Sequence, residues 1–251
     1  MRKHFLALIP LLLFPLSTRA NMGETIDKTT QYLMQNWRAD ETLQKLYPPQ
    51  VLSVPKGVKV YGGCGEQIKG DDVAGSYYCP YTHTVILDKP QLSAFYDAFG
   101  ASSVAYIIAH EFSHALQGQL KIRLEEPNHE LQADCMAGIF IAVGSEELGI
   151  TREDTISMAQ AAYNIGDKTH GTGAQRAFAL MGGMGRVDFH CNPASIEKLA
   201  NNEIKDPLYK KLTRTRSGTG GINLAPTPYP KTAKGSLGLK SGFFSFMRSF
   251  F

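Results

Sequence analysis

Two histidines and a glutamate in the middle of the chain have the spacing of a zinc-binding helix. The segment reads His110-Glu111-Phe112-Ser113-His114. On a helix, residues four apart share one face, so both imidazoles can reach the same metal ion. Glu111 lies about 100° around the helix from His110, where it can act on a water molecule without being a ligand. The alternative, a buried histidine pair without metal, is disfavoured because burying two imidazoles and a carboxylate together is costly.

A hydrolytic zinc site needs a third protein ligand and keeps a fourth position for water. Glu130 is the best candidate, because the next predicted helix opens near Pro127 and can fold back on the first. Asp134, one turn further on, would then accept a hydrogen bond from the second nitrogen of a ligand histidine. Glu130 and Asp134 could instead belong to a solvated helix face. Three other residues compete as third ligand, namely His129, Cys135 and His170.

The elements around these residues predict an α+β fold, with a small antiparallel sheet followed by a mainly helical part that carries the metal site. Extended segments are expected over 51–61 and 77–88. The strand Thr84–Leu87 is expected to form an exposed edge against which an extended peptide can pair. Helical periodicity or helix-end signals predict helices over 22–47, 90–99, 101–119, 127–143, 151–166 and 173–184.

The first 20 residues predict a signal peptide. A basic head is followed by an apolar run from Phe5 to Leu16 and by small residues that end at Ala20. Cleavage is expected near Ala20, so the protein is expected to be periplasmic or secreted. A membrane anchor is the alternative, but the apolar run is short and contains two prolines.

The remaining chain divides by composition into a body over 21–205 and a tail over 206–251. The net charge of +3 over 251 residues argues against a nucleic-acid binder, which usually has a concentrated basic face. The tail is basic, Gly/Ser/Thr/Pro-rich and expected to be flexible. It ends in aromatic residues at helical spacing, which suggests contact with an anionic membrane surface. A disordered or partner-bound tail is the alternative.

Four cysteines in an exported chain favour disulfides, with three pairings open. Cys64 and Cys79 flank a turn-rich segment and suit a local bridge. Cys135 and Cys191 would then tie the helix of Glu130 to the C-terminal end of the body. A four-cysteine zinc site is disfavoured because the chain has no Cys-x-x-Cys pair.

Taken with their neighbours, these residues resemble the neutral zinc metallopeptidase family of bacterial exported or membrane-anchored proteins. The resemblance covers about residues 45 to 195 and implies a zincin-like fold, with zinc on His110, His114 and Glu130 and with Glu111 as catalytic base. The segments that carry it include Ala105-Tyr106-Ile107-Ile108-Ala109-His110-Glu111, Glu130-Leu131-Gln132-Ala133-Asp134-Cys135-Met136-Ala137-Gly138 and Thr169-His170-Gly171-Thr172.

Three positions depart from the family pattern. The family usually has Gly at Ser113, His at Ala115 and an acidic residue at Lys168. The first two positions are not ligands. At the third position, the change to Lys168 is accompanied by a connection to Thr169 that looks shortened. These two differences leave open how the helix after His170 approaches the cleft of the metal site.

The expected reaction is hydrolysis of a peptide or protein substrate by zinc-activated water, with Glu111 as general base. A further donor is needed for the developing oxyanion, and His170 is the first candidate, with Arg176 next. Either residue could instead be structural, for example through a pair between His170 and Asp167. A non-catalytic, zinc-stabilised exported protein that binds peptides or acts as a chaperone is the alternative function. An amidase acting on cell-wall peptides or small amides also fits this metal chemistry.

Overall fold

The computed structural model describes residues 21–56, 59–61, 67–69 and 75–214. The predicted signal peptide, Cys64 and the tail from 215 onward lie outside the described residues. Nine α-helices and a short 3-10 helix, η1 (Leu43–Lys45), occur in this part of the chain. The helices are α1 (Met22–Ala39), α2 (Lys89–Phe99), α3 (Ala101–Leu120), α4 (Asn128–Val143), α5 (Ser145–Leu148), α6 (Arg152–Asn164), α7 (Gly173–Gly183), α8 (Pro193–Ala200) and α9 (Pro207–Arg214).

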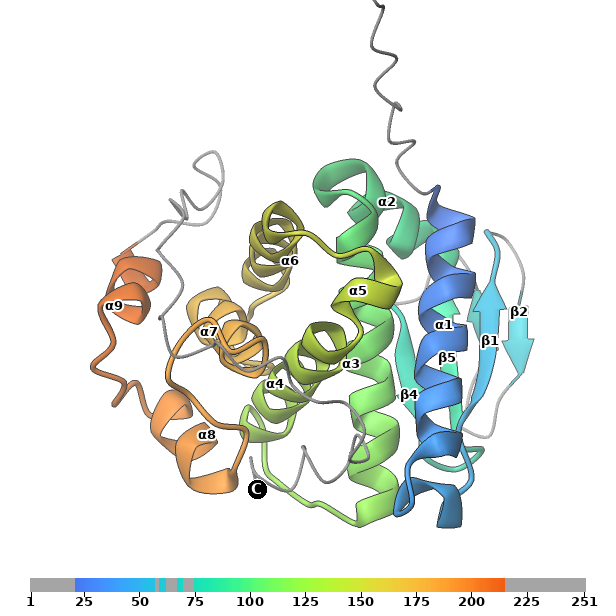
Figure 1. Ribbon diagram of the computed structural model, residues 1–251, viewed down its shortest axis with the longest axis horizontal. Coiled ribbons are helices and arrows are strands. Elements are labelled where there is room, and N and C mark those ends of the chain that lie inside the picture. Colours follow the sequence, from blue (N-terminus) through green and yellow to red (C-terminus); the bar gives the residue numbers. More distant parts are fainter. Residues whose placement is uncertain (1–20, 57–58, 62–66, 70–74, 215–251) are drawn as a thin grey trace, which may run out of the picture.

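Helix α3 runs through the centre of the molecule. The sheet lies on one side of it and α4, α6 and α7 lie on the other (Figure 1). Gly100 has a φ of +84°, a conformation that favours glycine, and it lets α3 begin directly where α2 ends. Most side chains of α3 are buried, including Val104, Ile108 and Phe112. A helix that is buried on almost every side must have other helices and strands packed around it, so α3 takes the central position.

The main sheet has three strands in the order β1-β5-β4. Strand β1 (Gln50–Val54) pairs parallel with β5 (Thr84–Asp88), and β4 (Tyr77–Cys79) pairs antiparallel with the other side of β5. The prediction of an antiparallel sheet is therefore wrong in part. Strand β4 runs back towards the end of the sheet where β1 begins, so the hairpin from β4 to β5 makes β5 parallel to β1 and places it between the two. A separate antiparallel pair joins β2 (Lys59–Tyr61) to β3 (Gln67–Lys69).

The strand over Thr84–Leu87 is not the exposed edge that its sequence suggested. It belongs to β5, which is central in the sheet and buried at every position. A strand buried on both faces has an apolar sequence whether it lies at an edge or in the centre, so composition could not separate the two cases. Among the described strands, β4 is the edge that faces α3.

Helices α4 and α7 approach each other closely at two glycines. An added Cβ at Gly183 would overlap the carbonyl oxygen of Cys135, and one at Gly138 would overlap the carbonyl oxygen of Leu180. Glycine permits this close approach because it has no side chain. The two helices therefore pack backbone to backbone, which brings Arg176 of α7 beside Asp134 of α4.

The folded body continues beyond the boundary expected at residue 205. Tyr209 and Leu212 of α9 are buried, and the Tyr209 ring packs against Phe178 of α7. The expectation of a flexible tail from 206 is thus wrong for the residues of α9. Their apolar positions are spaced as on one helix face, but the basic residues between them concealed this pattern.

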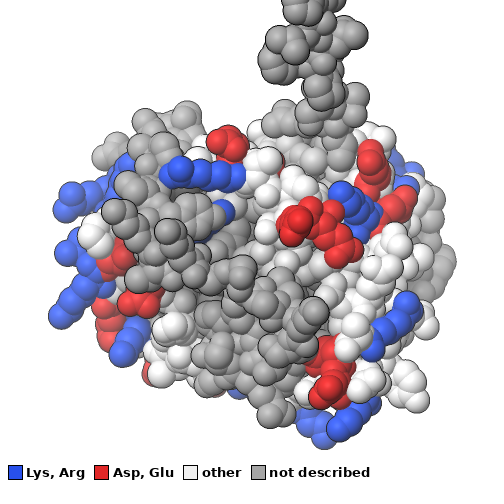
Figure 2. Space-filling model, viewed as in Figure 1, with Lys and Arg blue, Asp and Glu red and all other residues white. Residues whose placement is uncertain are grey.

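The described surface carries charges of both signs. Figure 2 shows Lys and Arg side chains interspersed with Asp and Glu side chains over the visible face. Among the described helices, none combines the length and apolar character that a bilayer-spanning segment requires. Two of the four cysteines form the disulfide Cys135–Cys191, which joins α4 to the segment before α8. Cys79 is also disulfide-bonded.

Candidate metal centre

Three side chains from two neighbouring helices converge on one point. His110 and His114 of α3 place their Nε2 atoms 3.1 Å apart. Glu130 of α4 lies against both, with Oε2 at 3.2 Å from His110 Nε2 and Oε1 at 3.2 Å from His114 Nε2. The structure thus brings together the three residues that the sequence proposed as ligands, and among the described residues they form a group able to hold a metal ion.

The donor set fits a zinc ion. Ligands about 2.0–2.1 Å from a tetrahedral zinc are separated from one another by about 3.3 Å, close to the separations seen here. Each histidine also has a polar oxygen close to its other ring nitrogen. Nδ1 of His110 lies 2.9 Å from Asp134 Oδ1, and Nδ1 of His114 lies 2.8 Å from Gln117 Oε1. If the neutral rings carry their protons on Nδ1, both Nε2 lone pairs point to the same place as the Glu130 carboxylate. Three electron-pair donors that meet in this way need a cation between them.

Asp134 holds His110 from within a buried polar cluster. Tyr106 of α3 donates its hydroxyl to Asp134 Oδ1 at 2.6 Å. Arg176 donates Nε to Oδ2 at 2.8 Å and Nη2 to Oδ1 at 3.0 Å, a two-point contact that fixes the carboxylate plane. Arg176 Nη2 also lies 3.6 Å from Glu130 Oε2. Arg176 therefore orients the Asp134 carboxylate and places a positive charge near Glu130.

The electrostatic field at the centre favours positive charge. Burial alone would lower the pKa of His110, but the neighbouring Asp134 and Glu130 outweigh it and raise this pKa to about 10. Burial would raise the pKa of the Glu130 carboxyl, yet hydrogen bonds from His110 and His114 hold it well below its usual range. The same field that favours a proton on His110 favours a metal cation in its place.

Glu111 lies beside the ligands without joining them. It is buried, and burial raises the pKa of its carboxyl against the opposing effect of His110 and His114. No hydrogen-bond or ion-pair partner of this carboxylate occurs in the described part of the chain. Glu111 lines a cleft of about 1200 Å³ together with the three ligands and the edge strand residues Tyr77 and Tyr78.

The residues that competed for the metal have other roles in the structure. The ring of His129 stacks on His114 at 5.0 Å, and burial lowers its pKa to about 4. The Cys135 sulfur is in the disulfide. His170 lines the cleft, but its Nδ1 is 2.7 Å from Asp167 Oδ2 and its side chain is about half exposed, at 49%. His170 therefore makes the pair with Asp167 that was named as its structural role.

Two residues at this centre were not singled out from the sequence. Tyr106 precedes His110 by four residues, and Gln117 follows His114 by three, so both lie on the same helix face as the histidines. This helical spacing could have indicated from the sequence that both residues lie near the metal ligands. Ser113, where the family usually has Gly, donates its hydroxyl to the Ala109 carbonyl at 2.8 Å and does not touch the ligands.

Asp134→Ala is expected to weaken zinc binding about 10- to 100-fold, because His110 loses the acceptor that orients its ring. The affinity is measured by competition with a chromophoric zinc chelator. Asp188→Ala serves as the control, since Asp188 is fully exposed, and it should bind zinc as the wild type does. Equal affinities of the Asp134→Ala variant and the wild type would remove the proposed role of Asp134.

Comparison with known proteins adds independent evidence. Residues 19–188 match the model of a family described as "Putative neutral zinc metallopeptidase". The chain is 29% identical over 170 residues to "Uncharacterized protein YpfJ" of Escherichia coli K12, covering 54% of this chain and 58% of YpfJ. It is 27% identical over 154 residues to "Uncharacterized protein Rv2575" of Mycobacterium tuberculosis H37Rv, covering 45% of this chain and 52% of that protein.

The chain thus spans only a little more than half the length of these curated relatives. No solved structure matches it significantly. The family match covers well over half of the chain and includes all three converging side chains and Glu111. This chain belongs to the neutral zinc metallopeptidase family.

Proposed function

We propose that the protein is an exported zinc-dependent peptidase with a zincin-like active site. The observation that carries the proposal is the convergence of His110, His114 and Glu130, with the buried Glu111 carboxylate beside them in an open cleft. A zinc ion held by the three ligands would supply a Lewis acid and bring the pKa of a bound water towards neutrality. A purely structural zinc site would need neither a cleft nor a buried carboxylate that lacks a partner among the residues the structure describes.

Glu111 is the general base of the proposed reaction. One of its carboxylate oxygens accepts the proton of the attacking water and then returns it to the departing amine nitrogen. Burial favours this role, because a carboxylate removed from bulk water binds a proton more readily than an exposed one. His170 lines the cleft near its mouth and is the candidate donor to the oxygen of the scissile carbonyl, oriented by Asp167.

Strand β4 is the proposed binding edge for the substrate backbone. Its residues Tyr77 and Tyr78 line the cleft, and its pairing with β5 leaves the opposite edge towards α3. An extended peptide can add to such an edge by main-chain hydrogen bonds, which recognise a peptide without requiring one sequence. This role replaces the one first expected for the strand over Thr84–Leu87.

Export is proposed from the N-terminal segment and supported by the disulfide. The sequence up to Ala20 has the pattern of a signal peptide. The bridge Cys135–Cys191 suits an oxidising compartment such as the periplasm or the extracellular space.

The proposed function is tested by digestion of a peptide library with the purified protein. Zinc-loaded protein should cleave peptides at internal bonds, and mass spectrometry should detect the new termini. Removing zinc with a chelator should stop cleavage, and adding one equivalent of zinc should restore it. Zinc-loaded protein that cleaves no peptide in a diverse library would count against the peptidase proposal.

A further inference from the structure

The two ligand histidines are oriented by different chemistry. His110 faces the charged carboxylate of Asp134, whereas His114 faces the neutral side-chain amide of Gln117, with Nδ1 at 2.8 Å from Oε1. A neutral imidazole binds metal through whichever nitrogen lacks a proton, so the partner of Nδ1 decides which nitrogen that is. A carboxylate can only accept a hydrogen bond from a neutral ring. An amide can accept or donate, depending on which of its ends faces the ring.

The amide of Gln117 is held in one orientation by its other contacts. Its Nε2 donates to the main-chain carbonyl of His129 at 2.9 Å and to Gln132 Oε1 at 3.1 Å. A carbonyl oxygen can only accept, so the nitrogen end of Gln117 must face His129. Its oxygen end is then left for His114, whose Nδ1 must carry the proton.

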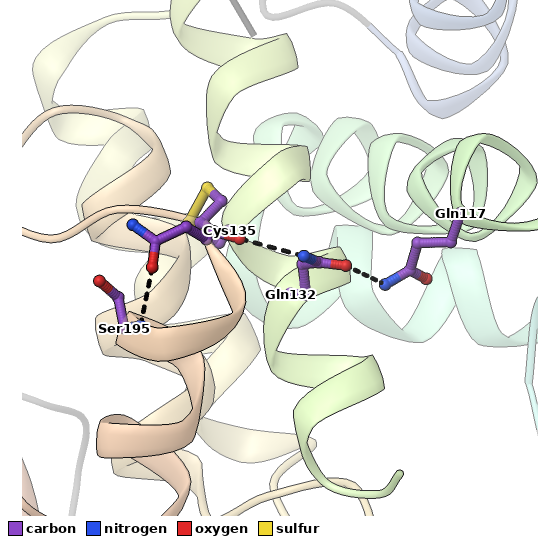
Figure 3. Close-up of a disulfide and its surroundings, with 6 residues drawn as sticks. Gln117, Gln132, Cys135 and Ser195 are labelled. Atoms are coloured by element: carbon purple, nitrogen blue, oxygen red, sulfur yellow. Dashed lines mark hydrogen bonds between the residues drawn. A yellow bond between two sulfur atoms is a disulfide. The ribbon is translucent and has the colours of Figure 1, made fainter. Parts of the chain in front are cut away.

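Gln132 repeats this arrangement one step further from the metal. Its Nε2 donates to the main-chain carbonyl of Cys191 at 3.1 Å, which leaves its oxygen to accept from Gln117. Figure 3 shows Gln117 of α3 and Gln132 of α4 pointing towards each other, with Gln132 directed at the segment that carries the disulfide. The main-chain carbonyls of His129 and Cys191 thus decide which end of each glutamine amide donates and which end accepts.

The amide chain is protected and anchored. The side chains of Gln117 and Gln132 are both 0% exposed, so bulk water does not compete for their hydrogen bonds. The Cys191 carbonyl that ends the chain belongs to a residue covalently joined to Cys135, which lies three residues after Gln132 on α4. The disulfide therefore holds the last acceptor of the chain against the helix that carries Gln132 and Glu130.

We propose that Gln117, aligned by Gln132 and the disulfide-held Cys191 carbonyl, is a positioning residue that keeps the proton on His114 Nδ1 and presents Nε2 to the metal. This inference rests on the proposed zinc site. The inference assigns a role to the buried hydrogen bonds that link α3, α4 and the segment before α8. The proposed reaction itself does not use these hydrogen bonds. The inference also explains why two glutamines are buried where apolar side chains would be cheaper to accommodate.

The experiment compares Gln117→Leu with Gln117→Glu in the full-length protein. Zinc affinity is measured by chelator competition, and melting of the metal-free protein is recorded for each variant. Gln117→Leu removes the acceptor at His114 Nδ1 and should weaken zinc binding about 10- to 100-fold. Gln117→Glu keeps an acceptor for His114 Nδ1, and its second oxygen, when protonated, can replace the amide as donor to the His129 carbonyl. This variant should therefore bind zinc about 10-fold more tightly than Gln117→Leu. Tyr32→Phe, which removes a buried hydrogen bond to α4 away from the metal centre, controls for loss of stability alone.

Each outcome decides the inference. Zinc affinity that is lost with Leu and recovered with Glu, with Tyr32→Phe unchanged, supports it. It is overturned if Gln117→Leu binds zinc as the wild type does, or if both Gln117 variants weaken binding equally. Wild-type protein that binds no zinc would overturn the proposed function and this inference together, whereas unchanged affinity in Gln117→Leu would overturn this inference alone.

Discussion

Glu111→Gln is expected to lower kcat/KM for peptide hydrolysis by about 10²- to 10⁴-fold while the protein still binds one zinc ion. The amide of glutamine cannot accept the proton of the attacking water, but it has almost the same size as the carboxylate. Glu111 has no hydrogen bond to lose among the described residues, so the fold should keep its stability. Cleavage of a peptide substrate identified in the library digest, together with the zinc content of each preparation, provides the measurement.

Glu125→Gln is the matched control for this variant. Glu125 lies exposed in the connection between α3 and α4 and does not line the cleft. The Glu125→Gln variant should cleave the substrate as fast as the wild type. Cleavage that survives unchanged in Glu111→Gln would remove Glu111 from the role of general base.

Arg176→Leu is expected to lower the free energy of unfolding by about 3–5 kcal/mol. Asp134 is fully buried, and Arg176 holds both of its oxygens, so the substitution leaves a buried carboxylate without its principal counter-charge. Burial alone would raise the pKa of the Asp134 carboxyl, but Arg176 and His110 together outweigh it and keep this pKa below its usual range. Urea unfolding of the metal-free protein, followed by circular dichroism, measures the loss.

Arg38→Leu tests whether the loss is specific to the buried pair. Arg38 is exposed on α1, and its replacement should change stability by no more than about 0.5 kcal/mol. Arg176→Lys should recover part of the loss, since it restores the charge but not the two-point contact. If Arg176→Leu proved as stable as Arg38→Leu, the buried cluster would not have the structural role assigned to it.

Most helices of this protein could be predicted from local sequence signals. Gly100 marks the end of α2, the apolar spacing from Val104 to Leu116 marks α3, and the segments of α4, α6 and α7 fall close to their predicted limits. The direction of β1 and the central place of β5 could not be predicted, since both depend on which strands meet after a long connection. Helix α9 was missed because its buried face consists of few residues within a basic segment.

The metal ligands were accessible to sequence reasoning because they follow helical spacing. His110 and His114 are one turn apart, and Glu130 and Asp134 repeat that spacing on the next helix. The contacts of Arg176 and Gln132 were not accessible in the same way. They depend on the close crossing of α4 with α7 and on where the Cys135–Cys191 bridge leaves the Cys191 carbonyl, and neither follows from local spacing.

The most direct test of the proposed metal centre is a crystal structure of the zinc-loaded protein with data collected at the zinc absorption edge. We expect one anomalous peak about 2.0–2.2 Å from His110 Nε2, His114 Nε2 and a carboxylate oxygen of Glu130, with a solvent molecule at the fourth position. The account would be contradicted by a zinc ion bound elsewhere, by a Glu130 side chain turned away from the histidines, or by a fourth protein ligand in place of solvent.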